Sequence, residues 1–204
     1  MVAQAVAAMS QLACLPARTV AELMAHVKAN PGTTAFASGG KGASNHLAGE
    51  LLRVITGVPL LHVPYNGNAP AMNDVIAGNA HLYFTSPASA MPFMPSGRLR
   101  MVAVASLKRS ALLPEVPTLA ESGVEGINEA AAHMIMAPAA TPKDILARLN
   151  REMVTALQTP AVKSRLANEG AEAVGNAPEA AVAMVRADLD KWIDVVRRTN
   201  IKLE

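Results

Sequence analysis

The residues best suited to chemistry lie in a glycine-rich stretch between an apolar segment and an amphipathic one. The stretch follows the apolar residues 34–37 and reads Ser38-Gly39-Gly40-Lys41-Gly42-Ala43-Ser44. A strand that ends in glycines and continues as a helix presents backbone N–H groups at the positive end of the helix dipole. This junction predicts a binding site for a carboxylate or another small anion. The alternative is that the glycines only form a tight turn.

Two nucleotide-binding motifs begin in the same way, and both are incomplete here. A Walker loop needs Ser or Thr after Gly-Lys, but Gly42 follows Lys41 in this sequence. The dinucleotide fingerprint needs a third glycine at the position of Asn45. The remaining interpretation is a small-anion site rather than a nucleotide site.

Side chains around the turn could add to such a site. Lys41 could supply a counter-charge, or it could be solvated at the tip of the loop, as most lysines are. Ser44 is the expected N-cap of the following helix, and His46 in its first turn could contact a ligand or cap a neighbouring carbonyl group. Ser44 and His46 point to different faces of that helix, and no Gly-x-Ser-x-Gly motif occurs. We therefore expect no catalytic residue and no enzyme.

Two further loops are expected at the same edge of the fold. Residues 33–122 alternate strands and helices, which predicts a mostly parallel sheet covered on both faces. Ligands gather at the carboxyl ends of the strands in such sheets. Besides the glycine stretch, this edge would hold Tyr65-Asn66-Gly67 and Thr85-Ser86. The hydroxyl groups of Tyr65 and Thr85 would point into a cleft, or they would pack between the loops.

Capping residues and apolar spacing predict the elements that position these loops. Thr19 and Glu22 form a capping box for a helix that ends at residues 30–32. Strands are expected at residues 34–37, 60–63, 81–84 and 99–105, the second of them buried. Helices are expected from Ser44 to Gly57 and from about Pro70, with Ser86 and Pro87 starting another and Thr118 a short one that Gly123 ends.

The character of the sequence changes after Gly126. One apolar strand is expected at residues 134–137, and a short one at 171–174. Helices are expected to begin at Thr141, Thr159 and Pro178. This helical part has no sheet of its own, so it either packs back on the middle of the chain or was built for a sheet that the sequence lacks.

Composition excludes several classes of function. The 204 residues are 51% hydrophobic, which is enough for a sizeable core. Only 17% are charged, the net charge is +2 and 3% are aromatic, so no basic or base-stacking surface for nucleic acid is expected. The histidines show no paired metal spacing, so we expect no metal site, and we expect no cofactor.

The single cysteine and the first residues indicate no targeting or redox role. Cys14 has no partner for an intramolecular disulfide and is expected to be a buried thiol. Residues 1–17 carry no charge, and a secretory signal needs positive residues at its start. We therefore expect one or two buried strands there, and no segment long enough to span a bilayer.

A series of segments matches a known family in order and spacing. The segments are Asn30-Pro31-Gly32, residues 38–51, His62-Val63-Pro64-Tyr65-Asn66-Gly67, Pro70-Ala71, Ser96-Gly97-Arg98-Leu99-Arg100, Leu113-Pro114-Glu115-Val116-Pro117-Thr118, Glu121, Gly123, residues 137–142 and Leu149-Asn150. With these segments the sequence resembles the C-terminal two-thirds of the Bug-type periplasmic solute-binding proteins of tripartite tricarboxylate transporters.

The resemblance implies an α/β fold of the periplasmic binding protein type II-like class, with a complete lobe two and a partial, mainly helical lobe one. Residues 1–31 would be a lobe-one remnant strand, crossover and capped helix, 32–126 the lobe-two α/β domain, and 127–204 the return crossover and C-terminal lobe-one helices. The implied function is to bind a small carboxylated solute between the lobes and deliver it to membrane permease subunits, with a periplasmic location. The alternative is a ligand-sensing or interaction module of the same fold class.

In that family the solute carboxylate is held between a glycine-containing loop of each lobe, largely through backbone N–H groups, small hydroxyl groups and water. The lobe-two loop corresponds to residues 38–44 here. The family's N-terminal portion, which holds the other loop, is absent from this sequence, so we expect impaired solute binding. We also expect exposed apolar surface on the terminal helices that promotes self-association. Residues 129–136 depart from the family's pattern, which leaves the shape of the pocket open there.

Overall fold

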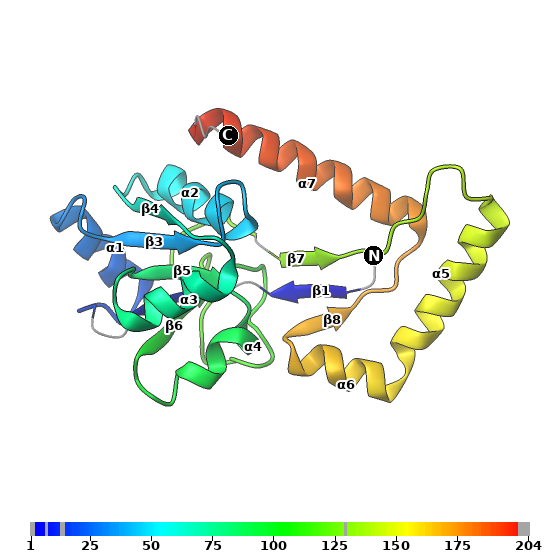
Figure 1. The fold of residues 1–204 in the computed structure, drawn as a ribbon, viewed down its shortest axis with the longest axis horizontal. Coiled ribbons are helices and arrows are strands. Elements are labelled where there is room, and N and C mark those ends of the chain that lie inside the picture. Colours follow the sequence, from blue (N-terminus) through cyan, green and yellow to red (C-terminus); the bar gives the residue numbers. More distant parts are fainter. Residues whose placement is uncertain (1–2, 7, 13–14, 129, 200–204) are drawn as a thin grey trace.

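The computed structural model describes residues 3–6, 8–12, 15–128 and 130–199, which form two sheets and their helices (Figure 1). The larger sheet has five strands in the order β4-β3-β5-β2-β6. Strand β3 is parallel to β4 and β5, whereas β2 is antiparallel to β5 and β6. The predicted parallel arrangement is therefore correct for β3, β4 and β5. The five strands are β2 (Ala8–Leu12), β3 (Ala35–Ser38), β4 (Leu61–Pro64), β5 (Leu82–Thr85) and β6 (Leu99–Val104).

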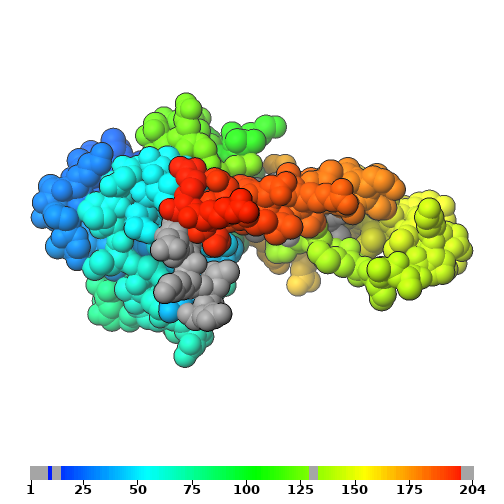
Figure 2. Space-filling view, turned by 90° about the horizontal axis from the view of Figure 1, so that it is seen from above, coloured from blue at the N-terminus to red at the C-terminus, as the bar shows by residue number. Residues whose placement is uncertain are grey.

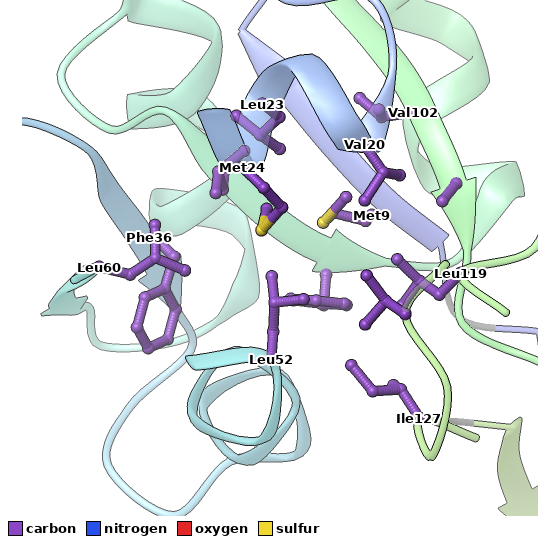
Figure 3. Close-up of a cluster of buried hydrophobic side chains, with 14 of the residues drawn as sticks. Met9, Val20, Leu23, Met24, Phe36, Leu52, Leu60, Val102, Leu119 and Ile127 are labelled. Atoms are coloured by element: carbon purple, nitrogen blue, oxygen red, sulfur yellow. The ribbon is translucent and has the colours of Figure 1, made fainter. Parts of the chain in front are cut away.

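Different helices cover the two faces of this sheet, because successive strand residues point to opposite sides. Phe36 and Leu82 belong to one buried cluster, and their neighbours Ala37 and Tyr83 belong to the other. Figure 3 shows part of the first cluster, to which Leu52 contributes from a helix. The first cluster lies under α1 (Val20–Ala29) and α2 (Ser44–Thr56), and the second under α3 (Asn68–Ala77), α4 (Pro87–Ala90) and the 3-10 helix η1 (Met91–Phe93).

A smaller antiparallel sheet lies beside the larger one (Figure 1). Its central strand β1 (Ala3–Val6) pairs with β7 (Ala130–His133) and with β8 (Ala171–Ala173). The chain passes between the two sheets twice, from β1 to β2 and from residue 128 to β7. Helices α5 (Lys143–Gln158) and α6 (Pro160–Asn168) extend away from the larger sheet.

Helix α7 (Pro178–Thr199) joins the two parts of the molecule. It starts beside the smaller sheet and runs back across the top of the structure to α2 (Figures 1 and 2). Val195 is buried in the first core cluster, and Trp192 and Ile55 pack against that cluster. The C-terminal helix therefore packs back on the middle of the chain, while β8 belongs to the smaller sheet.

The first residues differ in part from the expected division of the chain. Strands β1 and β2 confirm the expectation of strands near the N-terminus, and Cys14 lies outside the described residues. Strand β2 and helix α1, however, belong to the larger sheet and its core rather than to the smaller one. The reason is that β2 fills the place between β5 and β6, while α1 buries Leu23 and Val27 on the same face as α2.

Two predicted strands are wrong in detail. The strand expected to be buried at residues 60–63 is β4, which lies at the edge of the sheet with Leu61 50% exposed. The strand expected at residues 134–137 forms instead at β7. The first residue of β1, Ala3, pairs with His133, the last residue of β7, so the described part of β1 does not reach the apolar run that starts at Met134. Ile135 and Met136 in that run are exposed.

The capping box near the end of the larger domain forms without its helix. The Thr118 N–H donates to Glu121 Oε2 at 2.7 Å, and the Glu121 N–H donates to Thr118 Oγ1 at 3.0 Å. Residues 119–123 nevertheless form turns rather than the predicted short helix. Thr118 instead makes a parallel bridge to Val104, which extends the pairing of β6. The box at Thr19 does start the predicted helix, with the Glu22 N–H donating to Thr19 Oγ1 at 3.2 Å.

Candidate functional site

The glycine turn and the Tyr65 loop meet at the carboxyl edge of the larger sheet. They follow the parallel strands β3 and β4, which pair up to Ser38 and Pro64. The Tyr65 N–H donates to the Ser38 carbonyl, and the Gly67 N–H donates to the Gly39 carbonyl, both at 3.0 Å. A Cβ atom on Gly39 would lie 2.3 Å from Asn68 Oδ1 and 3.3 Å from the Asn68 backbone nitrogen, so a larger residue would require Asn68 to move. These contacts bring two of the three predicted loops together.

The N–H groups of the glycine turn are occupied by the turn's own neighbours. The Gly39 N–H donates to Asn45 Oδ1 at 3.1 Å, and the Gly40 N–H donates to Ser38 Oγ at 3.2 Å. The Gly42 N–H donates to His46 Nδ1 at 2.9 Å. The expected row of free glycine N–H groups is therefore wrong for these three residues. Positive φ values at Gly40 and Gly42, +139° and +77°, make glycine the favoured residue there.

The backbone N–H groups that could bind an anion follow the glycine turn in the chain, at the start of α2. Ser44 is the first helical residue and not the N-cap, because Ala43 holds the extended conformation before the helix. In the part of the chain that the structure describes, no side chain caps this helix. The N–H groups of Ser44, Asn45 and His46 have no acceptor one helical turn earlier, and thirteen residues of helix dipole lie behind them. This first turn is an anion-binding arrangement.

Asn45, which was not among the predicted site residues, connects the glycine turn to the start of α3 and to strand β5. Its side chain is buried, and its Oδ1 atom accepts from the Gly39 N–H. Its Nδ2 group donates to Asn68 Oδ1 at 3.0 Å and to the Tyr83 hydroxyl at 3.1 Å. Burial raises the pKa of Tyr83 to about 12, so this hydroxyl remains protonated. An asparagine at the place of a fingerprint glycine was the signal in the sequence.

Two histidines, His46 in α2 and His62 in β4, also hold the glycine turn in place. The rings of His46 and His62 stack with centroids 3.8 Å apart, and the ring of Phe36 stacks on His62 at 4.9 Å. A hydrogen bond of 2.6 Å joins Ser38 Oγ and His62 Nε2. The sequence offered two roles for His46, contact with a ligand or a hydrogen bond to a carbonyl group. In the structure its Nδ1 atom instead accepts a hydrogen bond from the Gly42 N–H. Both imidazoles therefore fix the shape of the turn.

Burial, and to a smaller extent nearby positive charge, disfavours protonation of the two histidines. Burial lowers the pKa of His62 to about 4, with further lowering from His46 and from the nearby Lys41. Burial also lowers the pKa of His46, although the Glu50 carboxylate opposes this shift. Lys41 is exposed at the tip of the turn, and its effect on both pKa values places positive charge at this edge. Both imidazoles are therefore neutral at pH 7, while Lys41 places positive charge at the rim of the site.

Acid is expected to destabilise the protein through His62. In the unfolded chain His62 binds a proton near pH 6.5, whereas in the folded chain it binds one only near pH 4. Between these pH values the unfolded state binds more protons, so the free energy of unfolding decreases as the pH falls from 6.5 to 4. Between pH 7 and pH 4, we expect the free energy of unfolding of His62→Gln to decrease by about 2 kcal/mol less than that of the unsubstituted protein, after allowance for solvent screening. Urea unfolding of both proteins at several pH values measures this difference. An equal pH dependence in the two proteins would contradict the assignment.

Tyr65 contributes its backbone to the site and its side chain elsewhere. Its hydroxyl donates to Asp74 on α3, and its ring packs against the second core cluster. The hydroxyl therefore does not point to the sheet edge, and packing is the correct one of the two predicted roles. Burial, followed by the bond to Asp74, raises the pKa of Tyr65 to about 12. The next residue, Asn66, is exposed.

The third predicted loop lies at the same edge but is already capped. Ser86 is the N-cap of α4 with Pro87 after it, as predicted, and its Oγ accepts from the Ser89 N–H at 3.3 Å. This helix end is therefore not free, and α4 has only four residues. Thr85 ends β5, next to β3 in the sheet, and is half-buried. The side-chain hydrogen bond from this strand to Asn45 in α2 comes from Tyr83.

Two other kinds of feature are absent among the described residues. No group of three or more His, Cys, Asp or Glu side chains is arranged to hold a metal ion there. No helix among those residues is long and apolar enough to cross a bilayer.

Comparison with known proteins places this geometry in a family. The family model of the "Tripartite tricarboxylate transporter family receptor" matches residues 1–201. The "UPF0065 protein in tcbD-tcbE intergenic region" of Pseudomonas sp. (strain P51) is 37% identical over 86% of this chain and 52% of its own length. "Protein BugT" of Bordetella pertussis is 35% identical over 89% of this chain and 56% of its own length. The chain thus spans about half the length of these relatives.

Solved structures share the fold. "R. palustris Rpa4515 with adipate" superposes with a TM-score of 0.88 at 30% identity and covers 98% of this chain and 67% of its own. "MatC (Rpa3494) from Rhodopseudomonas palustris with bound malate" gives 0.83 at 25% identity and covers 95% and 67%. These relatives have the periplasmic binding protein fold, and the family is one of receptors rather than of enzymes. The chain therefore belongs to the tripartite tricarboxylate transporter receptor family, which includes the Bug proteins.

Proposed function

We propose that the carboxyl edge of the larger sheet binds one carboxylate group of a small carboxylated solute. The observation that carries this proposal is the start of α2, where the N–H groups of Ser44, Asn45 and His46 have no capping side chain within the described part of the chain. A carboxylate accepts such bonds in charge-assisted form, and the helix dipole adds to the attraction. The positive charge of Lys41 beside the turn has the same sign as the start of the helix dipole, and it also attracts an anion.

The remaining contacts of the site are assigned to residues already at this edge. The exposed Ser44 hydroxyl and the backbone of the Tyr65-Asn66-Gly67 loop flank the helix start, and Thr85 lies two strands away from β4. Gly39, Gly40, Gly42 and Ala43 shape the turn, and in this proposal they position the donors rather than bind the anion themselves. The adipate and malate named for two solved relatives favour a dicarboxylate as the solute.

At the level of the organism, the proposed role is that of the solute-binding component of a tripartite tricarboxylate-type uptake system. The chain would deliver its solute to membrane permease subunits from the periplasm, where solute-binding proteins of this kind work. In this proposal residues 32–126 form most of lobe two, and the smaller sheet with α5 and α6 belongs to lobe one. A second set of contacts from lobe one would close on the far end of the solute.

Calorimetry with a panel of dicarboxylates, including adipate and malate, and of aromatic acids tests the proposal. It should be run on this chain and on a version extended at its N-terminus with the corresponding portion of a longer relative. We expect the extended version to bind more tightly, because it adds contacts from lobe one. Absence of binding by both versions would overturn the proposal.

A proline substitution tests the role of the α2 N–H groups. Ser44→Pro removes one N–H group at a helix position that proline favours, and Ala43 already has φ −64° and ψ 154°, which a following proline requires. We expect about ten- to hundredfold weaker solute binding, since one charge-assisted hydrogen bond is lost. Ser44→Ala, which keeps the N–H group, is the matched control. Equal affinity of the proline variant and the control would assign the anion to another group.

A further inference from the structure

Glu50 is a buried carboxylate on the same face of α2 as His46. The two residues are 5% and 4% exposed, and their spacing of four residues places one above the other along the helix. The Oε2 atom of Glu50 accepts from Arg53 Nε at 2.8 Å. Its Oε1 atom lies 3.9 Å from His46 Nε2. Because carboxylates are rarely buried without a charged partner, both oxygens point to a defined role for Glu50.

The two ring nitrogens of His46 face different groups. The Nδ1 atom accepts from the Gly42 N–H at 2.9 Å, so the neutral ring carries its proton on Nε2. That nitrogen faces the Glu50 carboxylate. In the other tautomer an Nδ1–H group would meet the Gly42 N–H, and the lone pair of Nε2 would meet the carboxylate. The negative charge of Glu50 therefore favours the tautomer that accepts from the glycine turn.

We propose that Glu50 is a positioning residue for the glycine turn. It keeps the proton of His46 on Nε2, so that Nδ1 remains an acceptor for the Gly42 N–H, and Arg53 holds Glu50 in place. Stacking on His62, with ring centroids 3.8 Å apart, fixes the plane of the His46 ring but does not select its tautomer. A chain of contacts thus runs from Arg53 along α2 to the turn that precedes the helix.

Arg53 also balances the charge of Glu50 at His46. Burial has the largest effect and lowers the pKa of His46, Glu50 opposes this shift, and Lys41 in the turn and Arg53 add to the lowering. The ring of His62 in β4 faces His46 as well. Without Arg53, the carboxylate would favour a protonated His46, whose Nδ1–H can no longer accept a hydrogen bond from the turn. The acceptor is therefore retained only when the acid and the base are both present.

NMR measurement of the protection of the Gly42 amide against solvent exchange, together with the ¹⁵N signals of the His46 ring, tests this role. Glu50→Gln is expected to lower the protection about tenfold throughout the range from about pH 6 to about pH 8, because a neutral partner replaces a charged one. Arg53→Gln is expected to lower it only toward pH 6, with the titration midpoint of His46 moved upward. The Arg53 side chain is 40% exposed, so this variant keeps the fold, which circular dichroism verifies.

Two control variants separate this role from a general effect on the helix. Arg165→Gln in α6 makes the same change in net charge as Arg53→Gln and is expected to leave the Gly42 amide unchanged. His46→Asn keeps an acceptor near the position of Nδ1 but has no counterpart of Nε2. In this background Glu50→Gln is expected to change the protection by less than about twofold. An equal loss in both backgrounds would show that Glu50 does not act through His46 and would overturn the inference.

Calorimetry with adipate and malate, on the N-terminally extended version, extends the test to the solute, and this part rests on the proposed function. Glu50→Gln removes a negative charge from α2, which alone would tighten the binding of an anion. We expect about fivefold weaker binding instead, because the turn before the donors loses its fixed shape. If the Gly42 protection falls and the affinity does not, the role of Glu50 stands and the proposed anion site is wrong. If the protection keeps its wild-type value, the role of Glu50 is refuted whatever the affinity.

Discussion

Asn45→Ala is expected to lower the free energy of unfolding by about 3 kcal/mol and to weaken solute binding together with it. The truncation leaves the Gly39 N–H, Asn68 Oδ1 and the Tyr83 hydroxyl without the partner that now joins them. Each buried polar group that loses its partner costs about 1–3 kcal/mol, although Asn68 keeps some access to water. Denaturant unfolding measures the stability, and calorimetry measures the affinity.

Asn45→Asp separates the structural role of this residue from its electrostatic effect. The carboxylate still accepts from the Gly39 N–H but no longer donates to Asn68 or Tyr83, and it adds a negative charge at the start of α2. We expect it to weaken the binding of an anionic solute more than Asn45→Ala does, because like charges repel. A neutral ligand site would show the reverse order. Ser44→Ala, on the exposed neighbour, is expected to change stability by less than 0.5 kcal/mol.

Gly49→Ala is expected to destabilise the protein by about 2 kcal/mol, even though alanine is the better helix former. A Cβ atom at this position of α2 would lie 2.3 Å from Cε2 and 2.4 Å from Cδ2 of the Phe36 ring. The buried ring cannot move freely, because it stacks on His62 at 4.9 Å and is itself fully buried. Overpacking costs about 3 kcal/mol, and helix propensity returns about 1 kcal/mol. Thermal or denaturant unfolding measures the net change.

A double-mutant cycle with Phe36→Leu identifies the cause. The smaller side chain leaves room for the new methyl group, so Gly49→Ala is expected to cost less than 0.5 kcal/mol in the Phe36→Leu background. If its cost is the same in both backgrounds, contact with the Phe36 ring is not the source of the destabilisation.

Local patterns predicted most of the elements and the edge at which the loops gather. The glycine positions, the capping residue Thr19 and the Ser86-Pro87 pair each follow from a short-range rule, and the structure agrees with them. The resemblance to a family predicted the fold class, and the comparisons confirm it.

The errors concern residues whose roles depend on which side chain or strand meets them in the folded chain. Whether a glycine N–H is free depends on Asn45 and His46, whose side chains turn back onto the loop. The sequence left the Tyr65 hydroxyl either in the cleft or packed between the loops, and it bonds to Asp74 on α3. Likewise, the apolar residues 134–137 satisfy every local criterion for a strand, but β1 pairs with the residues before them. Side chains a few residues away decided the first two cases, and a long-range strand pairing decided the third.

Helix α7 has a mechanical consequence for any closing of the molecule. It begins beside the smaller sheet, and near its other end Val195 and Trp192 pack with Ile55. Ile55 lies near the end of α2, the helix whose first turn forms the candidate anion site. A rotation of the smaller sheet about the two crossings would therefore also change the packing of α7 on α2. Through this contact, α7 connects the angle between the two sheets to the helix whose first turn is proposed to hold a solute.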